Sequence, residues 1–321
     1  MTLTAPLLEA PIRPGPIAMR SVLLGCGVVG GGVAAHLPQG VRLGGVLART
    51  RRSDMPSGIP VFTRLSEIQA LRPQLVIETL PGGKLAEDAL EWAVGIGAHV
   101  VTANKAAAAR RPDLAARAKA QGTAFACSAA VGGGVPVLES IARLTIGGAR
   151  LTSVRGVLNG TSNFVLDRLA SGESLDLAIG AAQAAGFAES DPSADIDGRD
   201  AANKLALIAR AAWDIEIDPD QIGTETIRDL RPDLVPLART QGRRYRQVAR
   251  LDHAGGTLHA SVKLVAVGLD DPLARATRED NVVALNCADR APLILSGKGA
   301  GREPTAASVL GDIRRILAGR W

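Results

Sequence analysis

The chain has few aromatic residues and few cysteines. Phe, Trp and Tyr make up 2% of the 321 residues, which argues against the aromatic platforms that stack on single-stranded nucleic acid. The three cysteines, Cys26, Cys127 and Cys287, are widely spaced and form no Cys-x-x-Cys or Cys/His cluster. They predict neither a disulfide framework nor a structural zinc site, and they favour a cytoplasmic protein.

Long apolar segments are also missing. No stretch approaches the uninterrupted apolar length that crosses a bilayer, so membrane insertion is not expected. Residues 1–18 contain several prolines, with Arg13 as their only positive charge. This composition matches neither a signal peptide nor a transit peptide, and we expect a flexible leader there.

Charge is only mildly unbalanced. There are 37 Lys and Arg residues against 32 Asp and Glu residues, a net charge of +5. The densest basic run is Gly-Arg-Arg-Tyr-Arg at 242–246. So short a run is more often the exposed edge of a strand than a nucleic-acid site, so we expect a small-molecule ligand and no nucleic-acid partner.

The N-terminal part carries a glycine-rich turn between a predicted strand and a predicted helix. An apolar run ends at Leu24, the pattern Gly25-x-Gly27-x-x-Gly30 follows, and a small-residue segment then opens a helix. Glycines in this context let the backbone turn sharply and approach a pyrophosphate at the helix N-terminus. The candidate cofactor-binding residues here are Gly25, Gly27, Val28, Val29 and Gly30.

The residues after the second predicted strand bear on the choice of cofactor. In an NAD-binding fold an acidic residue after this strand binds the ribose 2′-hydroxyl. Here the strand at 41–48 is followed by Arg49-Thr50-Arg51-Arg52. Guanidinium groups suit a 2′-phosphate, so we predict NADP as the preferred cofactor over NAD, with Arg49 as a contact. An exposed basic loop is the alternative explanation.

Further strands alternate with helices. Apolar strands are expected at 75–80, 98–102 and 124–130, with a helix at 84–96. This alternation predicts an α/β fold with a Rossmann-type, doubly wound parallel sheet, in which ligands bind beyond the carboxyl ends of the strands. Lys105 follows one of those ends, which favours a functional role over that of an exposed loop lysine. We expect this dinucleotide-binding domain to cover residues 19–130.

A second domain, of the α+β class, is expected at 131–298. It opens on the Val131–Pro136 loop, whose three glycines can present backbone carbonyls and amides to a ligand or ion. A strand at 151–158 leads into the Asn159–Asn163 turn, and alternation over 251–295 indicates antiparallel strands. An amphipathic helix is expected at 306–319.

An acidic segment, Gly186–Lys204, holds five carboxylates and one lysine. Its spacing puts Asp197 or Gly198 at the start of a helix, with Asp200 in the first turn and Lys204 one turn later on the same face. A surface ion pair is the simplest explanation of such a pair. Five acids around one lysine instead favour a site for a cationic, hydrogen-bonding ligand such as an amino acid.

Taken in order, these motifs resemble those of the homoserine dehydrogenase family. The resemblance rests on the glycine turn, Thr-Ala-Asn-Lys at Thr102–Lys105, the Val131–Pro136 loop, the Asn159–Asn163 turn, the acidic signature and a closing motif from Gly299 to Asp312. It implies NAD(P)-dependent interconversion of L-homoserine and L-aspartate 4-semialdehyde, in threonine and methionine synthesis. It also implies a homodimer, and a final segment, 299–321, whose helix returns to the dinucleotide-binding domain.

The resemblance assigns roles to the acidic segment and its surroundings. Lys204 would be the general acid/base, and Lys105 would assist where nicotinamide and substrate meet. Asp200 would serve both catalysis and substrate binding, while Glu189 and Asp195 would bind or orient the substrate. Further cofactor contacts would come from Thr102, Gly186 and Gly299.

Several residues depart from the family's pattern. Ser128 stands where the family usually has Glu, in a stretch that supplies backbone carbonyls to a monovalent cation. Na⁺ or K⁺ would here be bound by the carbonyls of Ser128, Val131 and Gly133. Phe187 replaces a frequent Tyr. The chain ends at Trp321, so the threonine-binding regulatory domain that follows in many relatives is not expected.

Two other functions fit the motifs. One is an oxidoreductase of the same fold that acts on another amino-acid substrate, as the changes at Ser128 and Phe187 allow. The other is a catalytically silent paralogue that only binds nucleotide. The presence of Lys105, Asp200 and Lys204 argues against silence.

Overall fold

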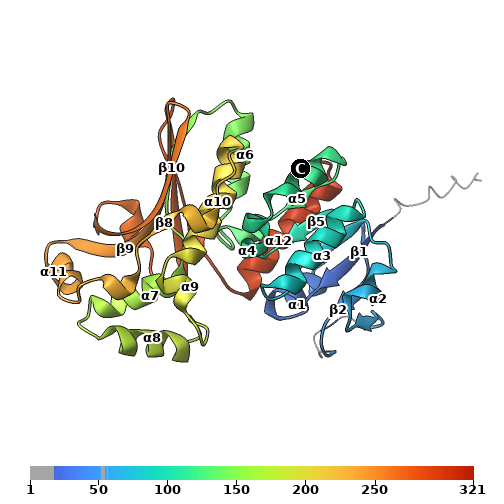
Figure 1. The fold of residues 1–321 in the computed structure, drawn as a ribbon, viewed down its shortest axis with the longest axis horizontal. Helices are drawn as coiled ribbons and strands as arrows, with labels where there is room; N and C mark the ends of the chain where they lie inside the picture. The colour runs from blue at the N-terminus through green and yellow to red at the C-terminus, as the bar shows by residue number, and fades with distance from the viewer. Residues whose placement is uncertain (1–17, 52–54, 56) are drawn as a thin grey trace, which may run out of the picture.

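The computed structural model describes residues 18–51, 55 and 57–321. The leader predicted for residues 1–18 therefore lies outside the described residues except for Ala18, and so does Arg52. Two six-stranded sheets, one formed by the N-terminal and one by the C-terminal part of the chain, organise the rest (Figure 1).

The first sheet has strand order β3-β2-β1-β4-β5-β6, and every pairing in it is parallel. This is the order of a dinucleotide-binding doubly wound sheet, and it confirms the predicted fold class. Its strands are β1 Met19–Leu24, β2 Val41–Leu47, β3 Val61–Phe62, β4 Leu75–Glu78, β5 His99–Thr102 and β6 Phe125–Ala126.

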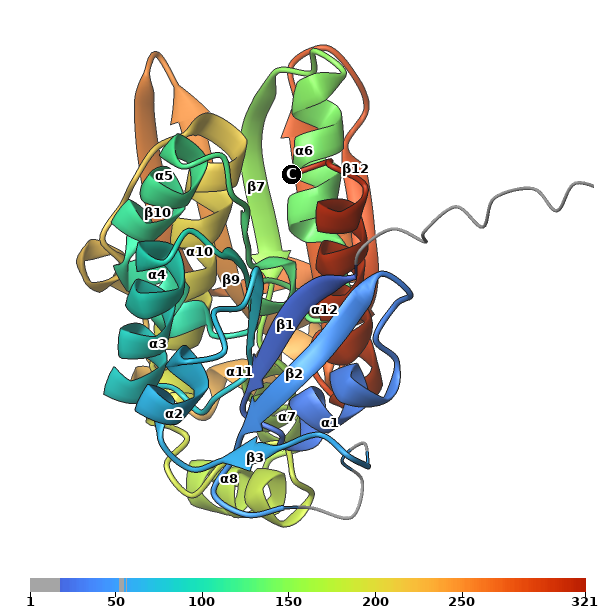
Figure 2. The same cartoon turned by 90° about the vertical axis from the view of Figure 1, so that its right-hand side faces the viewer.

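Helices cover both faces of this sheet because successive strand residues point to opposite sides. Val22, Val76 and Val100 pack toward α3, whereas Leu23 and Ile77 pack toward the last helix of the chain. Figure 2 shows α1 and α12 on one side of β1 and β2, and α2 and α3 on the other. The helices are α1 Val28–Ala35, α2 Leu65–Gln69, α3 Lys84–Gly95, α4 Lys105–Arg110, α5 Pro112–Ala120 and α12 Arg302–Leu317.

Helix α12 joins the end of the chain to its beginning. It starts at Arg302, four residues before the predicted 306, and its buried Val309 and Ile313 belong to the same apolar cluster as Leu23 of β1. It also contacts α1. The ends of the described chain are therefore packed against one another around the first sheet.

The strand predicted at 124–130 is shorter than expected. Strand β6 covers only Phe125–Ala126, and a 3₁₀ turn, η1 Ser128–Ala130, follows it. The N–H of Ser128 donates to the carboxylate of Asp312 on α12, at 3.0 Å, so it is not available to a neighbouring strand. This tertiary contact outweighs the local preference of an apolar segment for extended structure.

The second sheet has the order β12-β11-β7-β9-β10-β8. Its pairings are antiparallel except for β8 with β10, so the predicted antiparallel strands are confirmed. The strands are β7 Leu151–Val157, β8 Gly223–Thr224, β9 Arg243–Ala254, β10 Thr257–Gly268, β11 Asp280–Cys287 and β12 Leu293–Lys298.

One face of the second sheet carries the helices that reach the first sheet's half of the molecule. Leu205 and Ile208 of α10 and Ile141 of α6 share a buried cluster with Leu251 and Val283 of the sheet. Helix α10 also contacts α4, and both α6 and α10 lie on the side turned toward the first sheet (Figure 1). The helices of this half are α6 Val137–Ile146, α7 Gly160–Leu169, α8 Leu175–Ala184, α9 Ser193–Ile196, α10 Arg199–Trp213 and α11 Leu234–Thr240, with 3₁₀ turns η2 Pro219–Gln221, η3 Ile227–Asp229 and η4 Pro272–Arg275.

Within the described ranges, no helix combines the length and the apolar character that a membrane span requires.

Candidate active site

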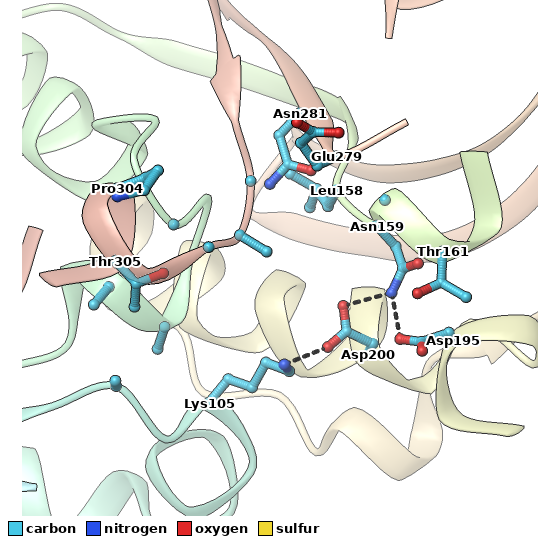
Figure 3. Close-up of a pocket in the computed structure, with 18 of the residues that line it drawn as sticks. Lys105, Leu158, Asn159, Thr161, Asp195, Asp200, Glu279, Asn281, Pro304 and Thr305 are labelled. Carbon is cyan, nitrogen blue, oxygen red and sulfur yellow. Dashed lines mark hydrogen bonds and ion pairs between the residues drawn. The ribbon is translucent and has the colours of Figure 1, made fainter. Parts of the chain in front are cut away.

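A cavity of about 1400 Å³ lies where the two halves of the chain meet. Its wall includes residues that follow β4 and β5 of the first sheet, the loop after β7, the loop before α10 and the start of α12 (Figure 3). The position beyond the carboxyl ends of parallel strands is the one at which such sheets bind ligands. Its polar side chains are those of Asn104, Lys105, Asn159, Thr161, Glu189, Asp191, Asp195, Asp200, Lys204, Glu279, Asn281, Lys298, Arg302, Glu303 and Thr305.

Asp200 binds two lysines from different parts of the chain. Its Oδ2 accepts from Nζ of Lys204 at 2.6 Å, and its Oδ1 lies 2.8 Å from Nζ of Lys105. Gly198, with φ 77°, is the N-cap of α10 and turns the chain into the helix, so Asp200 falls in the first turn and Lys204 one turn later. Both side chains are buried. The predicted pair is thus an interior group, not a surface ion pair.

Lys105 reaches this carboxylate from the first sheet. Strand β5 ends at Thr102, and the Asn104 side chain caps α4 by accepting from the N–H of Ala107. Lys105 is the first residue of that helix. Its side chain is 43% exposed, whereas that of Lys204 is 9% exposed. The carboxylate of Asp200 therefore binds one partly exposed ammonium group, that of Lys105, and one buried ammonium group, that of Lys204.

Burial and the charges of neighbouring groups shift the pKa values of Asp200, Lys204 and Lys105. Burial opposes ionisation of Asp200, but the charges of Lys204 and Lys105 outweigh it and hold the pKa of this carboxyl far below its usual range. Burial lowers the pKa of Lys204, the charge of Asp200 opposes this, and the charge of Lys105 adds to it. The charge of Asp200 raises the pKa of Lys105 against its desolvation. Lys204 is thus the lysine that gives up its proton more readily.

Asn159 links the acidic segment to α7. Its Nδ2 donates to Asp195 at 2.6 Å and to Asp200 at 3.0 Å, while its Oδ1 accepts from the N–H of Ser162 as the N-cap of α7. Nζ of Lys204 also donates to the carbonyl of the preceding residue, Leu158. Burial and the nearby charge of Asp200 raise the pKa of Asp195. The turn after β7 therefore positions both carboxylates and the buried lysine.

The start of the acidic segment lies at the rim of the cavity. Gly186, with φ 76°, follows α8, and both it and Glu189 are exposed residues of the cavity wall. Phe187 stacks on Phe164 of α7, with ring centroids 4.8 Å apart, and its carbonyl accepts from Thr161. Glu189 is therefore close to solvent, in contrast to Asp200.

The glycine turn is separate from the residues that line the cavity, but it has the shape of a phosphate cradle. Gly25 has φ +88°, and a Cβ there would lie 2.6 Å from the carbonyl oxygen of Thr79. A Cβ at Gly30 would lie 2.2 Å from the Gly25 oxygen, whereas one at Gly27 would meet nothing within 4 Å. Gly27 caps the N-terminus of α1. The backbone before this helix is therefore open to an anionic group, as dinucleotide binding requires.

The other predicted contacts are spread more widely. Arg49 is exposed two residues after β2, and Val28 is 60% exposed beside the glycine turn. Thr102 is fully buried and donates to the carboxylate of Glu78, so its side chain does not reach the cavity. Gly299 lies in the cavity wall before α12.

Ser128 belongs to a buried cluster of polar side chains at the C-terminal half of α12. Its Oγ accepts from Arg315 at 2.8 Å, and Arg315 also pairs with Asp312. The carbonyl of Ser128 accepts from the N–H of Val131. Of the predicted cation ligands, only Gly133 lines the cavity. No cluster of three His, Cys, Asp or Glu side chains suited to a metal ion occurs in the part of the chain that the structure describes.

Asn159 and Asn281 were not among the predicted site residues. Asn159 lies inside the predicted turn. An asparagine at a helix N-cap has its side-chain oxygen and nitrogen held in fixed directions, and this cap position is the signal that could have identified it as a site residue. Asn281 precedes the apolar run Val282 to Leu285 in a strand, which a sequence pattern does not distinguish from an ordinary strand end.

The parallel sheet has an open glycine turn, and the cavity at the ends of its strands contains two lysines that share one carboxylate. These features define an oxidoreductase with a Rossmann-type, NAD-binding domain. Comparison with known families narrows this class. Residues 25–127 match the family described as "Homoserine dehydrogenase, NAD binding domain", and residues 136–314 match "Homoserine dehydrogenase". The chain belongs to the homoserine dehydrogenase family, whose members are oxidoreductases of amino-acid biosynthesis.

Individual relatives agree with this assignment. The chain is 32% identical to a homoserine dehydrogenase from Synechocystis over 314 residues, which cover 92% of this chain and 72% of that protein. It is 34% identical to an NAD(+)-dependent homoserine dehydrogenase from Pseudomonas canavaninivorans, over 73% of this chain and 67% of that protein. Its structure resembles that of a homoserine dehydrogenase from Thiobacillus denitrificans with a TM-score of 0.87 and 29% identity, over 93% and 73% of the two chains.

Proposed function

We propose that this protein interconverts L-homoserine and L-aspartate 4-semialdehyde by NAD(P)-dependent hydride transfer, with lysine acid/base catalysis. The observation that carries the proposal is the carboxylate of Asp200, which is held between Lys105 and Lys204 in the wall of the cavity. A bound nicotinamide supplies or accepts the hydride, and the chain supplies orientation and proton transfer. The protein would act in the cytoplasm.

Lys204 and Lys105 have different parts in the proposal. Reduction of the aldehyde creates an alkoxide, which a nearby ammonium stabilises and protonates, and oxidation of the alcohol needs a neutral amine to take that proton. The lowered pKa of Lys204 suits the group that exchanges the proton. The raised pKa of Lys105 suits a lasting positive charge beside the reacting oxygen. Asp200 keeps both nitrogens in place.

Acidic groups would bind the amino-acid end of the substrate. Glu189 is at the exposed rim, and Asp195 and Asn159 lie deeper beside Asp200. An α-ammonium needs acceptors, which the two carboxylates provide, and Nδ2 of Asn159 is already engaged with Asp195 and Asp200. We therefore assign Glu189 and Asp195 to the ammonium group.

The cofactor would lie across the glycine turn, with the pyrophosphate at the N-terminus of α1. We propose NADP as the preferred form because Arg49 is exposed just beyond β2. NAD as the better cofactor is the alternative, favoured by the relative named NAD(+)-dependent. Arg49→Ala should raise KM for NADP much more than KM for NAD, and equal changes in both would contradict the assignment.

Two further parts of the proposal are a homodimer and a bound monovalent cation. Apolar side chains are partly exposed on strands β10 and β12, at Val265, Leu293 and Ile294, which supports association through the second sheet. The backbone carbonyls of Ser128, Val131 and Gly133 would hold Na⁺ or K⁺. The carbonyl oxygen of Ser128 already accepts from the N–H of Val131, so it would bind the cation through its second lone pair. Light scattering tests the dimer, and titration of the activity with KCl or NaCl tests the cation.

An assay of homoserine oxidation, with NADP and NAD in parallel, tests the main proposal. Formation of the reduced cofactor with homoserine, and its absence with serine or aspartate, would support it. Activity with another amino acid but not with homoserine would overturn the substrate. Cofactor binding without turnover of any amino acid would point to the silent paralogue.

A further inference from the structure

Arg302 is a cationic residue in the wall of the active-site cavity, and it belongs to the last helix of the chain. It is exposed and is the first residue of α12. Figure 3 shows Pro304 and Thr305, from the same turn of this helix, on the side of the cavity opposite Asp195. The start of α12 therefore lies away from a carboxylate assigned to the substrate. No role assigned above uses Arg302.

The side chain of Arg302 also packs against α1. A Cβ added at Gly32, in the second turn of α1, would lie 3.5 Å from Cγ and 3.7 Å from Nε of Arg302. The glycine thus leaves room for the stem of the arginine. Because Nε joins this stem to the rest of the guanidinium group, the positive charge lies close to α1. Arg302 therefore connects the cavity wall to the helix that follows the glycine turn.

Packing holds the start of α12 in this position. Gly301, the N-cap, has φ 117°, which few other residues adopt, and it turns the chain into the helix. A Cβ at Gly134 would lie 2.7 Å from Cβ of Pro304, so the proline rests directly on the loop before α6. The N–H of Gly134 donates to the carbonyl of Lys298 at 3.0 Å. The backbone at Arg302 is thus fixed before any ligand binds.

The proposed position of the pyrophosphate has no positive side chain of its own. Residues 25–35, which form the glycine turn and α1, include no Lys, Arg or His. They offer backbone N–H groups and the partial positive charge of a helix N-terminus to a group with two negative charges. An arginine suits such a ligand, because its planar guanidinium group donates two hydrogen bonds to a phosphate and keeps its charge.

The other cations of the cavity wall are positioned by carboxylates outside α1. Lys105 and Lys204 both bind Asp200. The Nζ of Lys298 lies 3.3 Å from the carboxylate of a glutamate that directly precedes β11. The position of Arg302 is instead set by its contact with α1, which places its charge beside the proposed pyrophosphate.

We propose that the guanidinium group of Arg302 binds the pyrophosphate of the dinucleotide, as a second anchor beside the glycine turn. This inference rests on the proposed NAD(P)-dependent function and deepens it. NAD and NADP have the same pyrophosphate, so Arg302 serves both equally. Arg49 is assigned to the 2′-phosphate, which only NADP carries. The last helix of the chain thereby takes part in cofactor binding, and Arg302 leaves the amino-acid substrate untouched.

Calorimetric titration with NADP and with NAD tests this assignment. Arg302→Met keeps an unbranched stem against Gly32 but removes the charge. The Kd for each cofactor should rise by the same factor, about tenfold, as expected for one lost charge-assisted contact. Arg302→Lys keeps the charge without the planar fork, so both Kd values should rise by a smaller factor.

Arg314→Met is the matched control. Arg314 is exposed in the last turn of the same helix, does not line the cavity, and its loss changes the net charge by the same amount. It should leave both Kd values unchanged. In Arg302→Met the melting temperature, and the KM for homoserine at saturating NADP, should stay near their wild-type values.

The outcomes separate this contact from the other proposals. A rise in Kd confined to NADP would move Arg302 to the 2′-phosphate, and unchanged Kd values for both cofactors would remove it from the cofactor site. Either result overturns the proposal. Absence of dinucleotide binding by the wild-type protein would instead refute the proposed function.

Discussion

Lys105 and Lys204 are separated by about a hundred residues in sequence, yet both bind the same carboxylate, one at each oxygen of Asp200. Lys204 belongs to the helix that carries Asp200, whereas Lys105 begins a helix of the other half of the chain. The shared carboxylate places two positive charges together that would otherwise repel each other. It also gives them unequal surroundings, because Lys204 is far more buried.

The first prediction concerns Lys204 as the proton-transfer group. Lys204→Met removes the amine but keeps an unbranched apolar chain, so kcat for homoserine oxidation should fall by about 10²–10⁴-fold. The Kd for the cofactor should change little, since this side chain lies with the substrate groups. Lys84→Met, on the exposed surface of α3, is the control. Near-normal turnover in Lys204→Met would remove this residue from the mechanism.

A second prediction follows from the opposing effects on the pKa of Lys204. Oxidation needs the neutral amine, so kcat/KM should rise as the pH rises through this pKa. In Asp200→Asn the charge that raises the pKa is gone, while burial and Lys105 still lower it. The rising limb of the pH profile should therefore move to lower pH, although the maximal rate falls. Asp220→Asn, at an exposed carboxylate that pairs with Arg110, should keep the wild-type limb, and a limb that moves upward in Asp200→Asn would contradict the assignment.

Much of the fold follows from short-range patterns. The predicted strand at 41–48 is β2, and the predicted helix junction at Asp197 or Gly198 is the left-handed N-cap Gly198. Glycine accounts for this junction because few other residues adopt that conformation. The segment 124–130 could not be predicted in the same way. Its backbone leaves the sheet to bind Asp312, which is 184 residues away from Ser128.

The candidate site likewise has some features that the sequence predicts and others that depend on tertiary packing. The spacing of Asp200 and Lys204 on one helix face was visible in the sequence, because a helix brings residues four apart together. The approach of Lys105 to the other oxygen depends on how α4 packs against α10, which no local pattern encodes. Asn281 is a stronger example, since only the packing of Gly299 and Gly133 gives its amide a fixed place at the cavity.

The glycine turn provides a third prediction, in which folding and cofactor binding separate. A Cβ at Gly27 meets no atom within 4 Å, and its φ of −77° suits alanine, so Gly27→Ala should keep the wild-type melting temperature. The new methyl group would stand before α1, where the pyrophosphate must approach, so the Kd for NADP should rise. Gly30→Ala should instead lower the melting temperature, because its Cβ would meet the carbonyl oxygen of Gly25.

Gly95→Ala is the matched control for this pair, since a Cβ at the end of α3 also meets nothing within 4 Å but is remote from the turn. It should change neither property. Wild-type cofactor affinity in Gly27→Ala would show that the pyrophosphate does not lie at this helix N-terminus.

The fourth prediction concerns Glu78, which is fully buried at the end of β4 beneath the residues that lead to Lys105. It accepts hydrogen bonds from Thr102 and from the N–H of Leu80. Burial raises its pKa from 4.5 to about 7, and the hydrogen bonds only partly oppose this rise. Between these two values the folded protein retains a proton that the unfolded chain releases. The free energy of unfolding should therefore decrease as the pH rises from 4.5 to 7, by about 3 kcal/mol from this group.

Urea unfolding of the wild type and of Glu78→Gln, across this pH range, measures the contribution. The glutamine does not ionise, so the stability of the variant relative to the wild type should increase with pH and become constant above about pH 7. Glu87→Gln, a partly exposed position on α3, should instead follow the wild-type curve. Parallel curves for Glu78→Gln and the wild type would mean that the buried carboxyl does not titrate in this window. A difference confined to acid pH would mean that the hydrogen bonds of Thr102 and Leu80 outweigh the burial of Glu78.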